Sequence, residues 1–208
     1  HSLPIQDGYS YRSLNILIEQ RRQGIQTVHL SSAKHPDDAK APSETIDNFE
    51  FHRTFASQAW WARLPVLDQL EVVRSLDHSL DALIATERPD LLHAHSPPLV
   101  GLAAVRAGAR HRLPVTYEIR AFWEDAAVDK GACQEGDWRY RATRALESHV
   151  VHRADAVTCI CAGLRDDLLA RGVPAHKLTV IPNAIDPSQF PTERFFDSSL
   201  AAKLGLLQ

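Results

Sequence analysis

Polar side chains that could bind or polarise a substrate stand directly after short apolar runs of the sequence. His95 ends the run that starts at Asp90, and residues 118–123 end the run that starts at Val115. Asn183 follows a third run, 177–181. If these runs are parallel strands, their carboxyl ends lie at one edge of a sheet, where α/β proteins bind ligands. The candidate binding residues of this edge are His95, Glu118, Arg120, Trp123 and Asn183.

Arg120 is assigned to binding and not to proton transfer. A guanidinium stays protonated and cannot act as a base, whereas its planar fork suits a phosphate or a carboxylate. Cys161 stands at a predicted helix start, where the pKa of a thiol can fall. The sequence places no histidine to activate it, so we expect a structural cysteine and assign no catalytic residue.

His93 and His95 are two residues apart, so a strand would place both imidazoles on one face. Such a pair could ligate a metal if a third ligand converged on it. No third ligand can be named from the sequence. We therefore predict no metal, and expect the histidines to line a cleft or to complete hydrogen bonds.

Gly8 precedes a predicted helix, in the stretch Pro4-Ile-Gln-Asp-Gly-Tyr9. Free backbone N–H groups and the helix dipole at such a position could meet an anion. A plain turn glycine explains Gly8 equally well. Gly8 and Tyr9 are the candidates for phosphate binding.

These residues must be positioned by an alternation of helices and strands. Periodicity predicts helices over 9–22, 66–84, 99–109, 138–151 and 164–170, and strands over 25–30, 90–95, 115–119, 156–160 and 177–181. Residues 31–48 are predicted as a loop, with a short strand at 49–51 beyond it. The expected fold is α/β and Rossmann-like, with a mostly parallel sheet and helices on both faces.

Two aromatic segments leave alternatives open. The acidic and aromatic segment 121–137 is predicted as a loop that stacks an acceptor sugar, lies near a lipid carrier, or is simply solvated. Trp60 and Trp61 allow contact with a membrane surface, although adjacent tryptophans before a helix more often pack on its flank.

Composition and missing motifs exclude several classes of protein. The 208 residues fit one domain, and the net charge of -3 with scattered Lys and Arg argues against nucleic acid. The motifs G-x-G-x-x-G, G-x-x-x-x-G-K-[ST] and G-x-S-x-G do not occur. Their absence argues against a dinucleotide enzyme, a P-loop phosphotransferase and an α/β-hydrolase, respectively. Three cysteines fit a reducing compartment, and without an apolar run of about 18 residues or a signal peptide we expect a cytoplasmic location. The absence of methionine, even at position 1, predicts a trimmed fragment.

Four stretches in order resemble the N-terminal lobe of bacterial family-4 glycosyltransferases of the GT-B type. They are the Gly8 loop with its helix, residues 90–95, residues 154–168, and Ile181-Pro-Asn-Ala-Ile-Asp186 to Phe190. The last two are the most specific. Residues 2–9, 34–36 and 117–125 look most like transferases of exosortase and exopolysaccharide gene systems.

This resemblance implies a retaining hexosyltransferase that needs no metal or cofactor. Its donor would be a UDP- or GDP-sugar, held mainly by a C-terminal lobe that is missing here, and its acceptor a polysaccharide or lipid-linked glycan. Residues 1–190 would form the acceptor-side lobe and 191–208 the start of the hinge, with a first strand before His1. The fragment alone is expected to be inactive, and peripheral contact with the inner membrane stays open.

Carried over by position, Gly8 and Tyr9 would meet the donor diphosphate, and His95 and Arg120 would line the acceptor side. Three residues depart from the family pattern. Arg120 stands where many relatives have His, Cys161 where they have Ser, and Ala184 where they have Gly.

Two other functions remain alternatives. A binding module could hold a glycan or an anionic metabolite in the same cleft without chemistry. A nucleotide-sugar 2-epimerase of similar architecture would need an array of carboxylate and histidine side chains facing the sugar, and the sequence reveals none.

Overall fold

The computed structural model describes residues 7–34, 41–57, 59–64, 66–185 and 198–205. Four strands form a parallel sheet in the order β4-β5-β6-β7. These strands are β4 (Leu92–His95), β5 (Val115–Ile119), β6 (Ala156–Cys159) and β7 (Leu178–Val180). A smaller sheet has the order β1-β3-β2, with β1 (His29–Ser31) parallel and β2 (Ser43–Ile46) antiparallel to β3 (Phe49–Arg53).

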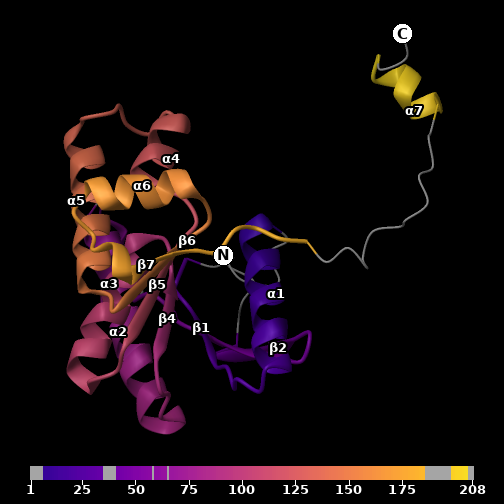
Figure 1. The fold of residues 1–208 in the computed structure, drawn as a ribbon. Helices are drawn as coiled ribbons and strands as arrows, with labels where there is room; N and C mark the ends of the chain where they lie inside the picture. Colours follow the sequence, from indigo (N-terminus) through magenta and orange to yellow (C-terminus); the bar gives the residue numbers. More distant parts are fainter. Residues whose placement is uncertain (1–6, 35–40, 58, 65, 186–197, 206–208) are drawn as a thin grey trace.

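Helices alternate with the strands of the parallel sheet, which confirms the predicted α/β fold (Figure 1). They are α1 (Gly8–Arg22), α2 (Leu67–Glu87), α3 (Pro98–His111), α4 (Trp123–Asp129), α5 (Trp138–Arg153), α6 (Ala162–Ala170) and α7 (Ser198–Lys203), with 3-10 turns η1 (Trp60–Arg63) and η2 (Ala175–Lys177). No helix within these described ranges is both long and apolar enough to cross a bilayer.

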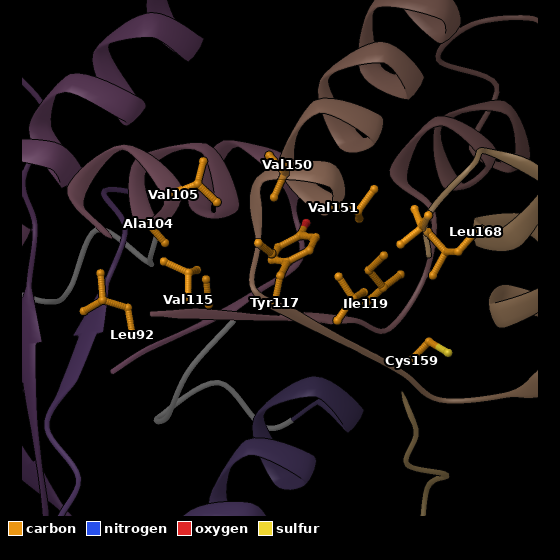
Figure 2. Packing of buried hydrophobic residues seen from close by; sticks show 14 of the residues in the cluster. Leu92, Ala104, Val105, Val115, Tyr117, Ile119, Val150, Val151, Cys159 and Leu168 are labelled. Carbon is orange, nitrogen blue, oxygen red and sulfur yellow. The ribbon is translucent and has the colours of Figure 1, made fainter. Parts of the chain in front are cut away.

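The main core lies between the parallel sheet and the layer of α3 and α5. Figure 2 shows Tyr117 and Ile119 of β5 pointing toward Val150 and Val151 of α5, with α1 on the opposite face of the sheet. Successive residues of β4 alternate between the two faces of the sheet. Leu92 and Ala94 enter this core, whereas His93 and His95 point to the opposite face.

Small residues let α3 approach the sheet closely. A Cβ atom on Gly101 would stand 2.6 Å from both the Tyr117 ring and Val150 Cγ1, and one on Gly108 would stand 2.4 Å from Val115 Cγ2. Such distances are far inside van der Waals contact, so larger residues at these positions would push α3 outward.

Two further clusters place α1 and α2. Leu14, Leu17 and Ile18 of α1 pack on Phe49 and Phe51 of β3. On α2, Val73 and Leu76 pack with Leu30 of β1, while Leu80 also touches the main core. The helix α2 therefore spans both sheets through its later turns, whereas Leu67 and Leu70 in its first turn are exposed.

Buried charged side chains connect the turn after β5 to the end of α6. Glu124, in the first turn of α4, is fully buried and lies 2.9 Å from Arg171 Nη1, at the end of α6. The Arg171 guanidinium also lies 3.8 Å from the centre of the Phe122 ring. These contacts attach α4, and with it residues 120–123, to α6.

Three local predictions were wrong in part. The segment 121–137 is not all loop, because 123–129 forms α4, where Glu124 and Asp125 in the first turn suit the helix dipole. The predicted loop 31–48 contains β2, which pairs with β3 through a two-residue turn at Asp47 and Asn48, both with positive φ. Neither residue is glycine, so the usual hairpin signal was missing.

The strand predicted over 25–30 begins only at His29.

The expected hinge is described only in part. Within 191–208, residues 198–203 form α7, whereas 186–197 and 206–208 lie outside the described residues, as do residues 1–6. The position of the strand expected before His1 lies outside this sequence, so that expectation stays a prediction.

Candidate functional site

Glu118 is the centre of a polar cluster at the carboxyl edge of the parallel sheet. Its side chain is buried, and its Oε1 accepts hydrogen bonds from Arg12 Nε at 2.7 Å and from Arg120 Nε at 3.1 Å. Its Oε2 lies 3.5 Å from His93 Nε2 and 3.9 Å from His95 Nε2. The register of β4 and β5 sets His95 directly opposite Glu118, which is why these groups meet.

Arg120 links the end of β5 to the first turns of α1. Its Nη1 donates to the Tyr9 carbonyl at 2.7 Å and to Ser13 Oγ at 2.9 Å, and its Nη2 contacts His95 Nδ1. The residue is buried. A ligand phosphate could use this guanidinium only by displacing one of these acceptors.

Arg12 joins the same cluster to the segment that follows β7. Its Nη2 donates to the Ile181 carbonyl at 2.9 Å, and its Nη1 to Asn183 Oδ1 at 3.0 Å and to the Pro182 carbonyl at 3.1 Å. Sequence reasoning missed Arg12 because it belongs to no motif. The one available signal was its place in α1, one turn after Gly8.

The N-terminus of α1 lies beside this network. Asp7 caps the helix, and its Oδ1 accepts from the Ser10 backbone N–H at 2.8 Å. Among the described residues, a Cβ atom on Gly8 would meet nothing within 4 Å. An anion there would gain from the helix dipole and lose from the neighbouring Asp7 carboxylate.

The charges of the cluster set its protonation. Burial raises the pKa of Glu118, but its contacts with His93, His95 and Arg120 outweigh burial and hold that pKa far below its usual value. Burial, His93 and Arg120 lower the pKa of His95 well below its usual value. His95 is therefore neutral at pH 7, and since Arg120 can only donate, the ring proton lies on Nε2.

A divalent metal would face competition at this edge. His93, His95 and Glu118 offer ligand atoms within 4.8 Å of one another, so a third candidate ligand does converge on the histidine pair. Arg12 and Arg120 already contact the carboxylate, however, and Arg120 occupies His95 Nδ1. Ligating histidines usually donate their second ring N–H to an acceptor, which is the opposite of this arrangement. The contacts of Arg12 and Arg120 therefore argue against a cation at this edge.

The structure brings together most of the residues predicted at this edge, namely Tyr9 through its carbonyl, His95, Glu118, Arg120, and Asn183 through Arg12. Trp123 starts α4 and makes none of these contacts. Its buried indole Nε1 has no hydrogen-bond partner within the described part of the chain, and Lys130 Nζ lies 6.0 Å from its ring centre. Cys161 is exposed at the start of α6.

A sequence profile of the glycosyl transferase 4-like domain matches residues 7–184, which include every residue of this cluster. The chain belongs to this family. A search of curated proteins found no match by sequence.

Two solved structures share the fold. Sucrose-phosphate synthase from Thermosynechococcus elongatus aligns over 93% of this chain and 47% of its own, with a TM-score of 0.61 and 16% identity. A candidate UDP-N-acetylglucosamine 2-epimerase from Listeria monocytogenes aligns over 91% of this chain and 46% of its own, with a TM-score of 0.55 and 15% identity. This chain thus spans about half the length of each. This chain, a glycosyl transferase 4-like domain, therefore has the fold of one Rossmann-like lobe of the GT-B type.

Proposed function

We propose that the chain is the acceptor-side lobe of a retaining glycosyltransferase, which moves a sugar from a UDP- or GDP-sugar to a glycan acceptor. The observation that carries this proposal is the junction of α1 with the carboxyl edge of the sheet. Arg12 and Arg120 both reach Glu118, and Arg120 also holds the Tyr9 carbonyl. Together they fix the helix N-terminus at the edge where α/β proteins bind ligands.

The donor diphosphate would lie at Gly8 and Tyr9. Sugar transfer leaves negative charge on the departing diphosphate, and fixed backbone dipoles stabilise such charge without reorganising. No described residue lies within 4 Å of a Cβ atom placed on Gly8, which supports the approach of a phosphate to the backbone there. The guanidinium groups of Arg12 and Arg120 add positive charge nearby, although Glu118 and backbone carbonyls already bind them.

The acceptor would lie along His95 and Asn183, with Trp123 as a candidate sugar platform. His95 is half-buried and neutral, with its Nε2 proton available to a sugar hydroxyl. Asn183 is exposed and keeps its amide nitrogen as a donor while Oδ1 accepts from Arg12. These groups suit a polyhydroxyl ligand. We propose a polysaccharide or lipid-linked glycan in bacterial exopolysaccharide synthesis, acting in the cytoplasm, as the resemblance implies.

A nucleotide-sugar 2-epimerase is the second candidate, because the array of carboxylate and histidine side chains that it needs is present. His93, His95 and Glu118 supply it. Against this reading, Glu118 has a pKa far below its usual value and is held by two arginines, so it is a poor acid and a poor base.

Isothermal titration of this chain and of the full-length gene product with UDP, GDP and their sugars tests the proposal. We expect tight binding of one nucleotide by the full-length protein and weak binding at best by this chain. Absence of nucleotide binding in both would favour the glycan-binding module. Epimerised sugar nucleotide without any acceptor would favour the second candidate.

A further inference from the structure

Two fully buried carboxylates lie behind the candidate site, on the side of the sheet that α5 covers. Glu124 belongs to the first turn of α4 and Glu147 to α5, and both are 0% exposed. Tyr117 of β5 is equally buried and points toward α5 (Figure 2). Because Tyr117 directly precedes Glu118, β5 faces the candidate site on one side and these two carboxylates, which we term the acidic pair, on the other.

The acidic pair has no hydrogen-bond donor in the described part of the chain. None of its four carboxylate oxygens forms a hydrogen bond there, and neither does the Tyr117 hydroxyl. Burial raises the pKa of Tyr117 well above its usual value, and the charges of Glu147 and Glu124 add to this effect. An ionised carboxylate only accepts, whereas a protonated carboxyl also donates. A proton on one member therefore supplies the donor that the acidic pair lacks.

The charges around the acidic pair balance when one of its members is protonated. Arg171, whose side chain is 4% exposed, lies 2.9 Å from Glu124 and also pairs with Asp167. Arg144 lies 4.0 Å from Glu124 and 3.6 Å from Asp167. Two guanidinium groups thus face two carboxylates, and an ionised Glu147 adds a third, fully buried negative charge. Burying a charge without a partner of its own is costly, which favours the protonated form.

The other charged residues of the helices around Glu147 pair elsewhere or lie at the surface. Those of α3 bind Asp77 and Asp81 of α2, and those of α4, α5 and α6 lie at the surface. They are Arg106, Arg110 and His111 on α3, Asp125 and Asp129 on α4, Arg139, Arg141, His149, His152 and Arg153 on α5, and Arg165 and Asp166 on α6. Burial therefore dominates and raises the pKa of Glu147 to about 7, with the Glu124 charge adding to burial and Tyr117 and Arg171 opposing it.

The helix α4 is the weakest element that packs on the acidic pair. Of its seven residues, all of them described, only Glu124 is buried. By contrast, α5 has 16 residues and buries Val150 and Val151 completely. Segments with few buried contacts open at the lowest free energy. A change of charge beside Glu124 therefore acts first on α4.

Residues 120–123 connect α4 to the candidate site. Phe122, at the N-cap of α4, lies under the Arg171 guanidinium, 3.8 Å from its ring centre. Arg120, two residues earlier, holds the Tyr9 carbonyl in the first turn of α1. A movement of α4 therefore reaches the N-terminus of α1.

We propose that one proton held by the acidic pair keeps α4 attached to α5 and α6, and that α4 opens together with residues 120–123 when this proton leaves to solvent. The ionised Glu147 then competes with Glu124 for Arg171, and opening of α4 lets water reach both carboxylates. The positions of Arg120 and Trp123 thereby depend on pH. The opening of α4 does not rest on the proposed function, whereas its effect on a sugar ligand does.

Hydrogen exchange of the full-length protein from pH 5.5 to 8.5, corrected for the intrinsic pH dependence of exchange, tests the proposal. The amides of residues 126–130 should be less protected than those of Val150 and Val151, because α4 opens locally. Their protection should fall about twentyfold between pH 5.5 and 7.5 and little further by pH 8.5. This fall follows because Glu147 regains its ordinary pKa in the opened state, so that opening releases a proton.

Glu147→Gln removes the titrating group and should hold the protection of residues 126–130 at the acid level throughout this range. Glu135→Gln is the matched control, since Glu135 is exposed in the segment between α4 and α5, and it should keep the fall of the parent. Three results overturn the proposal: protection in the parent that does not change with pH, equal protection of α4 and α5 at every pH, or the same fall in Glu147→Gln as in the parent.

Carbon-13 NMR of the Glu147 carboxyl in the parent protein keeps the proposal testable if Glu147→Gln does not fold. We expect a titration midpoint near pH 7. A midpoint near pH 4.5 would show that the acidic pair holds no proton at neutral pH and would overturn the proposal.

The two proposals fail separately. Protection of α4 that depends on pH, in a full-length protein that binds no nucleotide, would leave the opening of α4 standing and remove the transferase. Nucleotide binding with protection of α4 that does not change with pH would do the reverse.

Discussion

Arg12 of α1 and Glu118 of β5 form an ion pair with 2.7 Å between Nε and Oε1, although 106 residues separate them in the chain. Arg12 also binds the Ile181 and Pro182 carbonyls, so one guanidinium connects the first helix, the central strand and the end of the matched domain. The position of the α1 N-terminus therefore depends on contacts with two distant points of the sequence.

Replacing Arg12 tests this connection. Arg12→Gln should lower the free energy of unfolding by about 1–3 kcal/mol, less than for an isolated buried pair because Arg120 still contacts Glu118. Urea unfolding measures the change, and hydrogen exchange should show faster exchange near residues 181–183. Arg22→Gln is the control, since Arg22 lies on the same helix and both it and its partner Glu19 are exposed. Equal stability of the two variants would show that the Arg12 contacts contribute nothing.

Gly8→Ala separates a phosphate site from a turn. The added Cβ meets open space, so unfolding should be unchanged or slightly harder. If a diphosphate approaches the backbone here, the nucleotide affinity of the full-length protein should fall about tenfold or more, as measured by titration calorimetry. Unchanged affinity would make Gly8 an ordinary turn glycine.

Two glycine substitutions should have opposite effects on stability. Gly101→Ala places a Cβ atom 2.6 Å from Tyr117 and Val150, and should destabilise the protein by about 1–3 kcal/mol through overpacking. Gly163→Ala, in the first turn of α6, meets nothing within 4 Å and should be neutral or stabilise by up to about 1 kcal/mol. Thermal unfolding of both variants measures the contrast. A stable Gly101→Ala variant would contradict the close approach of α3.

Glu147 predicts that stability falls as pH rises. Burial, with the neighbouring Glu124 charge, raises the pKa of Glu147 from 4.5 to about 7, against the opposing effects of Tyr117 and Arg171. Between pH 4.5 and about 7 the folded protein binds more protons than the unfolded chain, so the free energy of unfolding falls as the pH rises. The contribution of protonated Glu147 to stability is full below pH 4.5 and is lost by about pH 7. The change should not exceed about 3 kcal/mol.

Urea unfolding from pH 4.5 to 8 measures this dependence. Glu147→Gln should remove the part of the slope that belongs to Glu147 and should be more stable than the parent above pH 7. Glu87→Gln, at the exposed end of α2, should leave the slope unchanged. Identical pH profiles for the parent and Glu147→Gln would show that Glu147 titrates alike in both states.

Local pattern determined much of this protein. Helical periodicity predicted α1 and α2, and apolar runs predicted β4, β5, β6 and β7, because buried faces impose their period on the sequence. Since parallel strands end at one edge, the positions of His95, Glu118 and Arg120 after those runs were enough to predict that they lie together. The signal failed where structure depends on pairing, as in β2, which needs β3 beside it.

Tertiary structure alone decided what those side chains do. Arg12 joins the cluster because Leu14, Leu17 and Ile18 hold α1 on β3, and no spacing within α1 reveals a partner 106 residues away. The same holds for Glu118, whose low pKa arises from arginine and histidine side chains of other elements. The sequence by itself determined which elements form and which polar residues end them. Only packing decided their charge partners, because Coulomb interactions depend on distance in space and not along the chain.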